Sequence, residues 1–249
     1  MASHVLRSES GVRQPDDAAL DDPLFIRAIH RATQVLDVFR TADRPLSLAE
    51  IARGAGLDRS AAQRIVHTLR MTGHLRRAED DRGYLPGIRL LDHGLDYLRL
   101  NPLVRRASPV LMELRRNLQE RVDLSLFDDL RMVYAARNQS KRETFLATLT
   151  GYSVPTYCSS GGLAVLSRLS EARSRDIIAR SDLRALTPRT PVDPEAIMAA
   201  VAEARERGHA LCVEQVLMGE LALGVAVLDA QGNPVAAIHV VGSLSDWTA

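Results

Sequence analysis

Residues 47–86 constrain the fold of this chain more than any other stretch, because they combine two short helical segments, a tight turn and a basic hairpin. Ser47 and the glutamate three residues later have the spacing of a capping box, in which each satisfies a backbone group at a helix start. Gly56 can then supply the turn, since glycine adopts a left-handed backbone without strain. Asp58 is a suitable cap for a second helix, which the apolar spacing predicts over residues 59–71.

A short basic hairpin follows this second helix. Residues 74–77 and 83–85 have the composition of two short strands, and the polar residues between them form a turn. Residues 46–48 could add a third, very short strand to the hairpin. Two helices joined by a glycine turn and followed by a hairpin form the winged helix-turn-helix pattern, in which the second helix enters the major groove of DNA.

The local charge favours a DNA-binding surface over the alternative of a plain helical core. Between Arg53 and Arg77 there are six arginines and one acid, so this stretch carries a charge of +5 in a chain of net charge +1. The side chains that lie off the apolar stripe of the second helix are types that bond phosphates and base edges. Because the whole molecule is not a polycation, any nucleic-acid site must be local.

Length and composition favour one large or two modest domains. The chain has 249 residues, of which 46% are apolar, enough to form real cores. Its two cysteines, Cys158 and Cys212, show neither a disulfide framework nor a zinc spacing, which suits a reducing cytoplasm. No apolar run is long enough to span a membrane, and the N-terminus lacks the apolar region of a signal peptide.

The rest of the N-terminal half predicts a tail, a first helix and a linker. Residues 1–22 contain few large apolar side chains, so we expect a flexible tail. A helix over residues 25–40 would complete a DNA-binding domain that covers residues 23–86. Residues 87–101 predict a linker helix, whose apolar stripe either contacts a second copy of the chain or packs on its own domain.

Residues 102–249 predict an α+β domain around an antiparallel sheet, because strand-like and helix-like segments are segregated along the chain. A helix over residues 103–121 comes first, and the apolar side chains expected to face inward are Val104, Ala107, Val110, Leu111, Leu114 and Leu118. The remaining strands are predicted at residues 122–127, 131–136, 144–150, 210–213, 221–229 and 235–241, and the remaining helices at residues 161–169, 171–180 and 193–207.

A polar loop in this second domain leads directly into a helix. Ser159 and Ser160 are followed by two glycines, and the apolar helix begins immediately afterwards. Free backbone amides and the helix dipole at such a start favour an anion, for example the carboxylate of a small metabolite. Capping of the helix by a serine side chain accounts for the same residues without any ligand, so both interpretations remain open.

The chain shows no positive signal for catalysis or for a cofactor. It lacks the motifs of dinucleotide-binding, P-loop, zinc-protease and serine-hydrolase proteins. Cys158 or Ser160 could serve as the nucleophile of a small-molecule enzyme with an accessory helical domain, but no motif places a base beside either residue. The spacing of His209, Cys212 and His239 does not require a metal. A winged helix that binds protein instead of DNA is a further alternative.

The order of these segments resembles the isocitrate lyase regulator (IclR) family of bacterial transcription factors. The resemblance spans residues 25–243 and is carried by RAIHRATQVLDVF, RPLSLAEIARGAGLDRSAAQRIVHTL, GYLPGIRLLDHG, PTYCSSGGLAVL and VEQVLMGELALGVAVLDAQGNPVAAIHVVG. It implies a winged-helix domain, a helical linker and a GAF/PAS-like C-terminal effector domain, in homodimers that often pair into tetramers. It also implies a non-enzymatic repressor or activator, which binds operator DNA and a small organic acid. FIRAI and MVYAAR are most similar to the branch that controls catabolism of aromatic compounds such as protocatechuate and 4-hydroxybenzoate.

Carried over by position, the resemblance implies two sets of site residues. The residues that would contact DNA are Arg59, Ser60, Ala61, Gln63, Arg64, Arg76, Arg77 and Arg82. The residues that would line the effector pocket are Leu146, Val154, Ser160, Gly161, Cys212, Ala222, His239 and Val241. Four of the pocket residues depart from the family pattern, which often has an acid at 212, a cysteine at 222 and small hydroxyl residues at 239 and 241. We therefore expect a less anionic and more apolar pocket, which favours a larger, partly apolar acid over glyoxylate.

Overall fold

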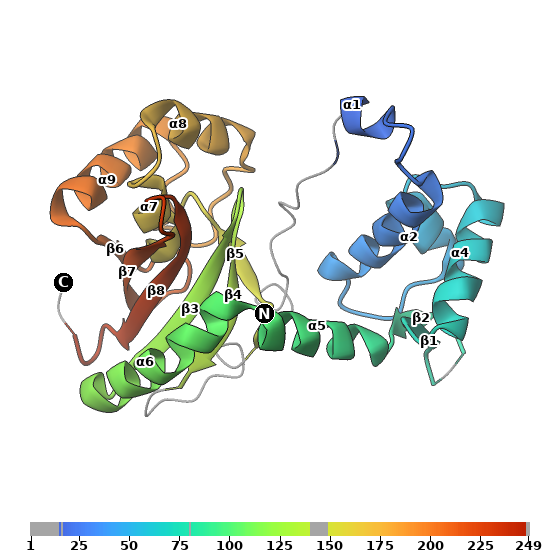
Figure 1. Cartoon of the computed structure of the whole chain (residues 1–249), viewed down its shortest axis with the longest axis horizontal. Coiled ribbons are helices and arrows are strands. Elements are labelled where there is room, and N and C mark those ends of the chain that lie inside the picture. The colour runs from blue at the N-terminus through green and yellow to red at the C-terminus, as the bar shows by residue number, and fades with distance from the viewer. Residues whose placement is uncertain (1–14, 16, 80, 140–148, 248–249) are drawn as a thin grey trace. The chain divides into compact units, whose positions relative to one another are not determined.

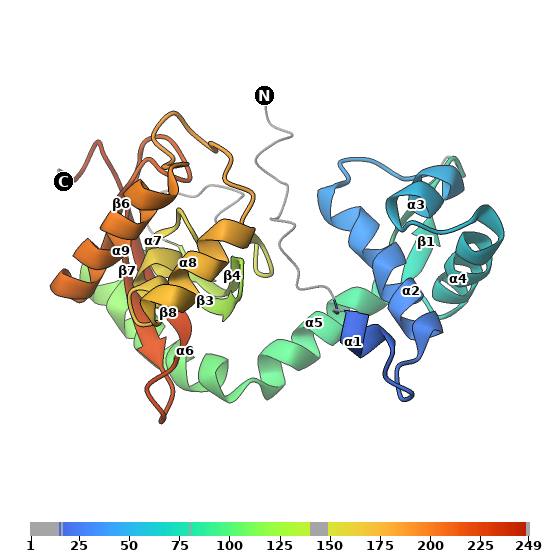
Figure 2. The same ribbon diagram turned by 90° about the horizontal axis from the view of Figure 1, so that it is seen from above.

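The computed structural model contains two compact units, each with its own core (Figures 1 and 2). The residues that the structure describes are 15, 17–79, 81–139 and 149–247. Among them, the first unit ends at Leu100 and the second begins at Asn101. In this described part of the chain, no helix combines the length and the apolar character needed to cross a bilayer.

The first unit is a winged helix-turn-helix, as the sequence predicts. Its elements are α1 (Asp17–Leu20), α2 (Arg27–Asp37), a 3-10 helix (Val38–Thr41), α3 (Leu48–Gly54), α4 (Arg59–Met71), β1 (Leu75–Arg77), β2 (Tyr84–Pro86) and α5 (Arg89–Leu100). Strands β1 and β2 pair antiparallel, and Leu46 forms a bridge to Tyr84 that adds a third short strand to the wing. The helix predicted over residues 25–40 is therefore divided into α2 and the 3-10 helix.

Helices α3 and α4 begin where side chains satisfy their first backbone amides. The Ser47 amide donates to Oε2 of Glu50 at 2.9 Å, and the Glu50 amide donates to Oγ of Ser47 at 3.3 Å, which completes the capping box. The Ala61 amide donates to Oδ1 of Asp58 at 2.8 Å. Gly56, with φ of +64°, makes the sharp turn between the two helices. The angle between α3 and α4 is thus defined by local interactions.

The buried face of α4 differs by one position from the centre of the stripe that the sequence predicts. The apolar spacing centres that stripe on Ala61, Ile65 and Leu69, with Ala62 and Val66 beside it. Ala62 and Val66 are buried, whereas Ala61, Ile65 and Leu69 are only partly covered. The stripe does follow the helical period, but neighbouring α2 and α3 cover only one edge of it. The other edge lines an open groove between α2 and α4.

The second unit is an α+β domain around a six-stranded sheet. Its elements are α6 (Pro102–Leu118), β3 (Arg121–Asp128), β4 (Arg131–Asn138), β5 (Ser153–Pro155), α7 (Ser160–Leu166), α8 (Glu171–Arg180), α9 (Pro194–Arg207), β6 (Ala210–Val213), β7 (Glu220–Leu228) and β8 (Pro234–Ser243). The strand order is β5-β4-β3-β8-β7-β6, and every neighbouring pair is antiparallel. β3 and β8, the first and last strands of this unit along the chain, thus lie next to each other at the centre of the sheet.

The two faces of this sheet are covered by different helices (Figures 1 and 2). Helix α7 packs against β7 and β8, and α6 packs against β3 and β4 on the other face. A β-bulge lies between Leu124 and Ser125 on β3. Cross-strand pairing places Asp123 beside His239 and Ser125 beside Tyr134, so these polar residues share the face that α7 covers.

Two expectations about the second unit need correction or fall outside the described residues. The strand predicted at residues 144–150 lies mostly within residues 140–148, which the structure does not describe, and its last two residues are not in a strand. The strand that pairs with β4 on the edge away from β3 is β5. The prediction that Val110 and Leu118 of α6 face inward is wrong, because these side chains are 50% and 42% exposed. Helix α6 rests on only two strands, so only one of its apolar edges is covered.

The capping box leads to a prediction about stability. Ser47→Ala removes the acceptor for the Glu50 amide and is expected to lower the free energy of unfolding by about 1 kcal/mol. Urea unfolding followed by circular dichroism measures this loss. Ser60→Ala is the matched control, because Ser60 lies in the first turn of α4 but is not its cap. Equal effects of the two substitutions would contradict a capping role for Ser47.

Candidate nucleic-acid interface and effector cavity

A concave surface of about 640 Å³ lies between α4 and the wing. The side chains that line it are Ser60, Gln63, Arg64, His67, Thr68, Arg70, Arg77 and Tyr84. Four of these eight residues belong to the set that the sequence assigns to DNA contact: Ser60, Gln63, Arg64 and Arg77. No acid is among the described residues of the lining, and its arginines and polar side chains offer donors suited to phosphate oxygens and base edges.

Arg77 is held in place on the wing. Its guanidinium lies over the ring of Tyr84, with 4.6 Å between Cζ and the ring centroid. Its Nη1 donates to the backbone oxygen of Asp81 at 3.1 Å, and its Nε lies 3.4 Å from the carboxylate of the same residue. These contacts restrict the side chain, although Arg77 remains exposed to solvent and able to meet a phosphate.

The other predicted DNA contacts occupy different positions. Arg59 is exposed in the first turn of α4, and Arg82 is exposed in the turn of the wing. Arg76 alternates with Arg77 on β1 and does not line the concave surface. Ala61 lines the groove toward α2 instead, so its contact with DNA is not supported by this placement.

Sequence reasoning left four lining residues out of the DNA-contact set: His67, Thr68, Arg70 and Tyr84. The helical period could have identified His67, because it follows Ser60 and Gln63 at spacings of seven and four on one face of α4. Tyr84 could not be found in this way, since only the pairing of β1 with β2 places it opposite Arg77.

A small cavity in the second unit lies beside the start of α7. Its volume is about 40 Å³, little more than one water molecule occupies in the liquid. The predicted pocket residues that line it are Ser160, Cys212, Ala222 and Val241. The lining residues that the sequence did not predict are Arg121, Tyr134, Ser159, Glu214, Gln215, Val216, Leu217 and Glu220.

The remaining predicted pocket residues lie elsewhere. Val154 is part of a buried apolar cluster that includes Met132 and Val165. Gly161 packs against the ring of His239, and any side chain at this position would overlap that ring. Leu146 lies outside the described residues. Neither Val154 nor Gly161 is among the described residues that line the cavity.

His239 is a buried, neutral part of the sheet face, and it does not line the cavity. Its Nε2 lies 2.6 Å from Oγ of Ser125, and its Nδ1 lies 3.1 Å from Oγ of Ser160. Burial lowers the pKa of the imidazole to about 3, and the nearby Arg137 and Arg121 lower it further in the same direction. His239, one of the residues assigned to the effector pocket, therefore contacts Ser160 from behind instead of lining the cavity.

Charged side chains in close pairs border the cavity. Arg121 binds Glu220 through two hydrogen bonds of 2.9 and 3.2 Å, and its Nε donates to Asp123 at 3.2 Å. Arg137 also donates to the buried Asp123 at 3.1 Å. Burial raises the pKa of Asp123, although the two arginines oppose this shift. The pocket wall thus carries both charges in closely paired form.

Comparison with known families decides between the remaining classes of function. The profile of the IclR helix-turn-helix domain matches residues 28–79, and the profile described as "Bacterial transcriptional regulator IclR C-terminal" matches residues 95–248. The chain belongs to the IclR family. Members of this family are transcriptional regulators, so this IclR-family protein is a DNA-binding regulator and not an enzyme.

Individual relatives support this assignment over almost the full chain. The Pca regulon regulatory protein of Pseudomonas putida is 30% identical over 88% of this chain and 75% of its own length. The transcriptional repressor IclR of Escherichia coli K12 is 25% identical over 95% of this chain and 87% of its own. The structure of an IclR homologue from Microbacterium hydrocarbonoxydans complexed with 4-hydroxybenzoate matches with a TM-score of 0.71, at 21% identity over 89% of this chain and 91% of that one.

Neither of the two candidate nucleophiles of the IclR-family protein has an effective base beside it among the described residues. Cys158 is completely buried in an apolar cluster. Ser160 does contact His239, a partner that the sequence did not reveal. An imidazole with a pKa of about 3 is too weak a base to activate a serine at neutral pH, and Ser125 occupies the position where a triad has a carboxylate.

The neutral state of His239 predicts how stability depends on pH. Its pKa is about 3 in the folded protein and about 6.5 when unfolded, so between these values the unfolded chain binds the extra proton. The free energy of unfolding should therefore fall as the pH decreases from 6.5 toward 3, by up to about 1.4 kcal/mol per pH unit from this residue.

His239→Gln should remove this share of the pH dependence, because glutamine retains hydrogen-bonding groups but does not titrate. Urea unfolding of the wild type and the variant at several pH values tests it. His209→Gln, at a partly buried histidine of the same unit, is the matched control. Parallel pH profiles for the wild type and His239→Gln would show that the buried imidazole is not the source.

Proposed function

We propose that the concave surface between α4 and the wing binds operator DNA, with α4 in the major groove and the wing on the phosphate backbone. The observation that carries this assignment is the convergence of Arg64, Arg70 and Arg77 on a surface whose described lining includes no acid. Arg64, Gln63 and Ser60 lie on the face of α4 that would reach base edges. Arg77, which Tyr84 supports, is suited to a phosphate.

We also propose that the cavity beside α7 accepts a small organic acid, with an aromatic acid as the favoured class. A relative controls the Pca regulon, and another relative is known in complex with 4-hydroxybenzoate. Apolar Ala222 and Val241 could contact a ring, while Ser160 and Arg121 could contact a carboxylate. A cavity of about 40 Å³ is too small for such a ligand, so binding requires that its walls move.

The walls that can move include the segment from Glu214 to Glu220, which contributes five of the cavity's lining residues. A ligand that favours the open arrangement of this segment would shift the balance between two states of the regulator, in proportion to its unequal affinity for them. In a homodimer, or a tetramer formed from two dimers, this shift would change the spacing of two DNA-binding units. We place this activity in the cytoplasm, where the DNA is accessible.

Two arginine substitutions distinguish base contact from phosphate contact. Arg64→Ala is expected to lower affinity for the operator by about 1–3 kcal/mol and to relax the sequence preference. Arg77→Ala is expected to weaken binding to all sequences alike and to reduce the slope of log affinity against log salt by about one unit. Titration of labelled duplexes at several salt concentrations measures both effects, and the promoter beside the gene is the first operator to test.

Arg173→Ala is a control for the loss of one arginine, because Arg173 lies in the second unit and pairs with Asp129. Unchanged operator affinity in Arg64→Ala would remove Arg64 from the contact set. An unchanged salt slope in Arg77→Ala would rule out its phosphate contact. Absence of duplex binding by the wild type would contradict the proposed interface.

The cavity can be tested by filling it. Ala222→Leu adds bulk to the wall and is expected to weaken binding of 4-hydroxybenzoate by about 1–3 kcal/mol, measured by isothermal titration calorimetry. DNA binding in the absence of ligand should stay unchanged. Val225→Leu is the matched control, because Val225 lies on the same strand but is 50% exposed on the other face. Equal ligand affinity in the wild type and Ala222→Leu would place the ligand elsewhere.

A further inference from the structure

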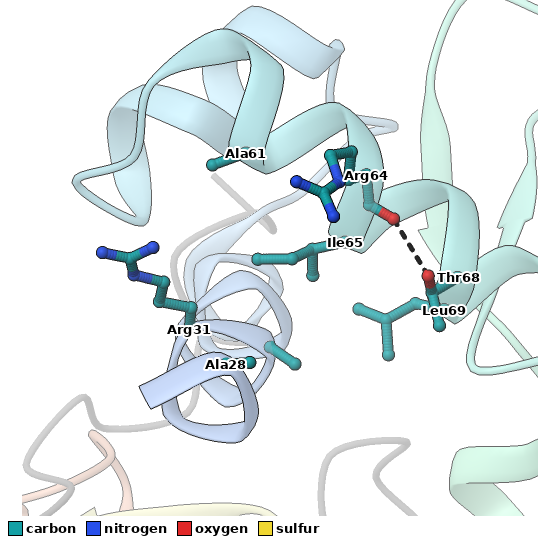
Figure 3. A pocket seen from close by; sticks show the side chains of 8 residues that line it. Ala28, Arg31, Ala61, Arg64, Ile65, Thr68 and Leu69 are labelled. Atoms are coloured by element: carbon teal, nitrogen blue, oxygen red, sulfur yellow. Dashed lines mark hydrogen bonds between the residues drawn. The ribbon is translucent and has the colours of Figure 1, made fainter. Parts of the chain in front are cut away.

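The C-terminal end of the recognition helix α4 is connected to the linker helix α5. Along its middle, α4 lies beside α2, and Figure 3 shows the side chains that line the open groove of about 370 Å³ between them. At its end, Gly73 adopts a φ of +77°, and the His74 amide donates to the backbone oxygen of Leu69 at 2.8 Å. This cap fixes the backbone of His74 at the end of α4.

A pair of histidines extends this end of α4 to α5. Nε2 of His74 lies 2.9 Å from Nε2 of His93, which belongs to the second turn of α5. The two ring planes are only 14° from parallel, and the ring centroids are 5.1 Å apart. The distance between the nitrogens is shorter than the spacing of about 3.5 Å between stacked rings. The rings therefore meet edge to edge, in an N–H···N hydrogen bond.

The neighbouring groups determine which nitrogen of His74 carries the hydrogen. The Thr72 hydroxyl donates to the backbone oxygens of Thr68 and Leu69 at 3.0 and 3.2 Å, so its oxygen is left to accept. This oxygen lies 2.8 Å from Nδ1 of His74, which is therefore the nitrogen that donates. Nε2 of His74 is then an acceptor, and Nε2 of His93 is the donor to it.

This arrangement tolerates one added proton but not two. The first can go to Nδ1 of His93, because the N–H group at Nε2 of the same ring continues to donate to His74. The second must go to Nε2 of His74, where two N–H groups and two positive charges would then face each other. Because histidine changes its charge between about pH 8 and about pH 5, mild acid favours this second step.

Helix α5 is only loosely packed on the first unit, which makes the histidine pair important for its direction. None of its described residues is buried, and Leu91 and Leu95 are 68% and 62% exposed. Its start is held through the backbone, where the Gly87 amide donates to the His74 oxygen at 2.8 Å. With so little buried surface, the contact of His93 is a main constraint on the rest of the helix.

No carboxylate compensates a second positive charge on the pair. The two acids of α5 near His93 are each paired with an arginine of the same helix, at 3.4 and 3.1 Å. In the part of the chain that the structure describes, neither histidine forms an ion pair. The charged residues of the elements that meet at the pair are Arg70 on α4, Arg76 on β1, and Arg89, Asp92, Asp96 and Arg99 on α5.

A metal ion accounts for the pair less well than a hydrogen bond does. Protein sites for zinc use three or four ligands, and the described residues contain no cluster of three histidine, cysteine or acidic side chains. Two rings that meet edge to edge also point at each other and not at a common ion.

We propose that the hydrogen bond between His74 and His93 is a proton-sensitive latch, which fixes α5 to the end of the recognition helix and opens when both imidazoles are protonated. The closed latch holds the direction in which the chain leaves the DNA-binding unit. Opening it frees the two DNA-binding units of a dimer to adopt spacings that do not match the operator. The latch itself is independent of DNA, whereas its effect on operator affinity rests on the proposed function.

Spin labels test the latch without DNA. Arg53→Cys on α3 and Arg99→Cys near the end of α5 provide two exposed sites in the full-length protein, and the native cysteines are buried. Labelled chains mixed with an excess of unlabelled chains report distances within one chain by double electron–electron resonance. One narrow distance is expected at about pH 7.5, and a broad distribution at about pH 5.

Substitutions of His93 separate the latch from a merely structural role of this side chain. Glutamine offers both a donor and an acceptor, so His93→Gln contacts His74 in either protonation state and should keep the distance narrow at both pH values. His93→Ala should give the broad distribution at both. A wild-type distribution that does not change with pH overturns the proposal, as does equal broadening in His93→Gln. Broadening by EDTA at neutral pH would assign the pair to a metal ion and overturn it too.

Operator affinity measured against pH tests the effect on DNA binding. Wild type and His93→Gln should bind equally at about pH 7.5, and the wild type should bind about fivefold more weakly at about pH 5 if the closed fraction falls to about one fifth. Comparing the two proteins removes the contribution of His67, which lines the concave surface in both. His209→Gln, in the second unit, controls for the loss of one histidine and should follow the wild type.

The two measurements separate the latch from the DNA-binding function. Equal operator affinities of wild type and His93→Gln at both pH values overturn the effect on DNA binding, even where the distance broadens. A distance that broadens in the wild type and not in His93→Gln, while no variant binds any duplex, supports the latch and contradicts the proposed DNA-binding function.

Discussion

The second unit depends on the direct contact between the backbone of α7 and the sheet. Gly224 on β7 leaves room for the backbone of Ser160, and a side chain at Gly161 or Gly162 would overlap His239 or the backbone of Thr156. Only glycine permits the backbone of α7 to lie so close to the strands, because any Cβ would force the helix away from them. The contact places Ser160 within 3.1 Å of His239 and fixes the floor against which the cavity forms. Ligand binding must therefore move the opposite wall, since α7 itself has no room to shift.

Around this contact, hydrogen bonds link the polar groups on the same face of the sheet, although Oδ1 of the buried Asp123 accepts none among the described residues. His239 is held between Ser125 and Ser160, and Asp123 is held by Arg121 and Arg137. Buried polar groups are costly unless they are paired, so such a network keeps one arrangement of the sheet. Arg121 joins the network to Glu220 at the end of the mobile wall that we propose. An anion that approached Arg121 would compete with Glu220, which connects ligand charge to movement of the wall.

Local signals in the sequence predicted most of the fold, and long-range contacts account for what they missed. The capping serine, the aspartate cap and the glycine turn act within a few residues, so the helix-turn-helix was predictable almost to its ends. The same reasoning could not find the contact of Ser160 with His239, which are 79 residues apart and meet only through the strand order. Nor could it show which edge of α4 or α6 would be covered, because the apolar period of a helix identifies a face but not its neighbours.

Arg64 shows how the position of one side chain depends on both local and long-range interactions. It is positioned by α4, whose start depends on the Asp58 cap, and it lines both the concave surface that we propose for DNA and the groove between α2 and α4. The placement of this proposed base contact therefore depends on a local cap and on the packing of α4 against α2.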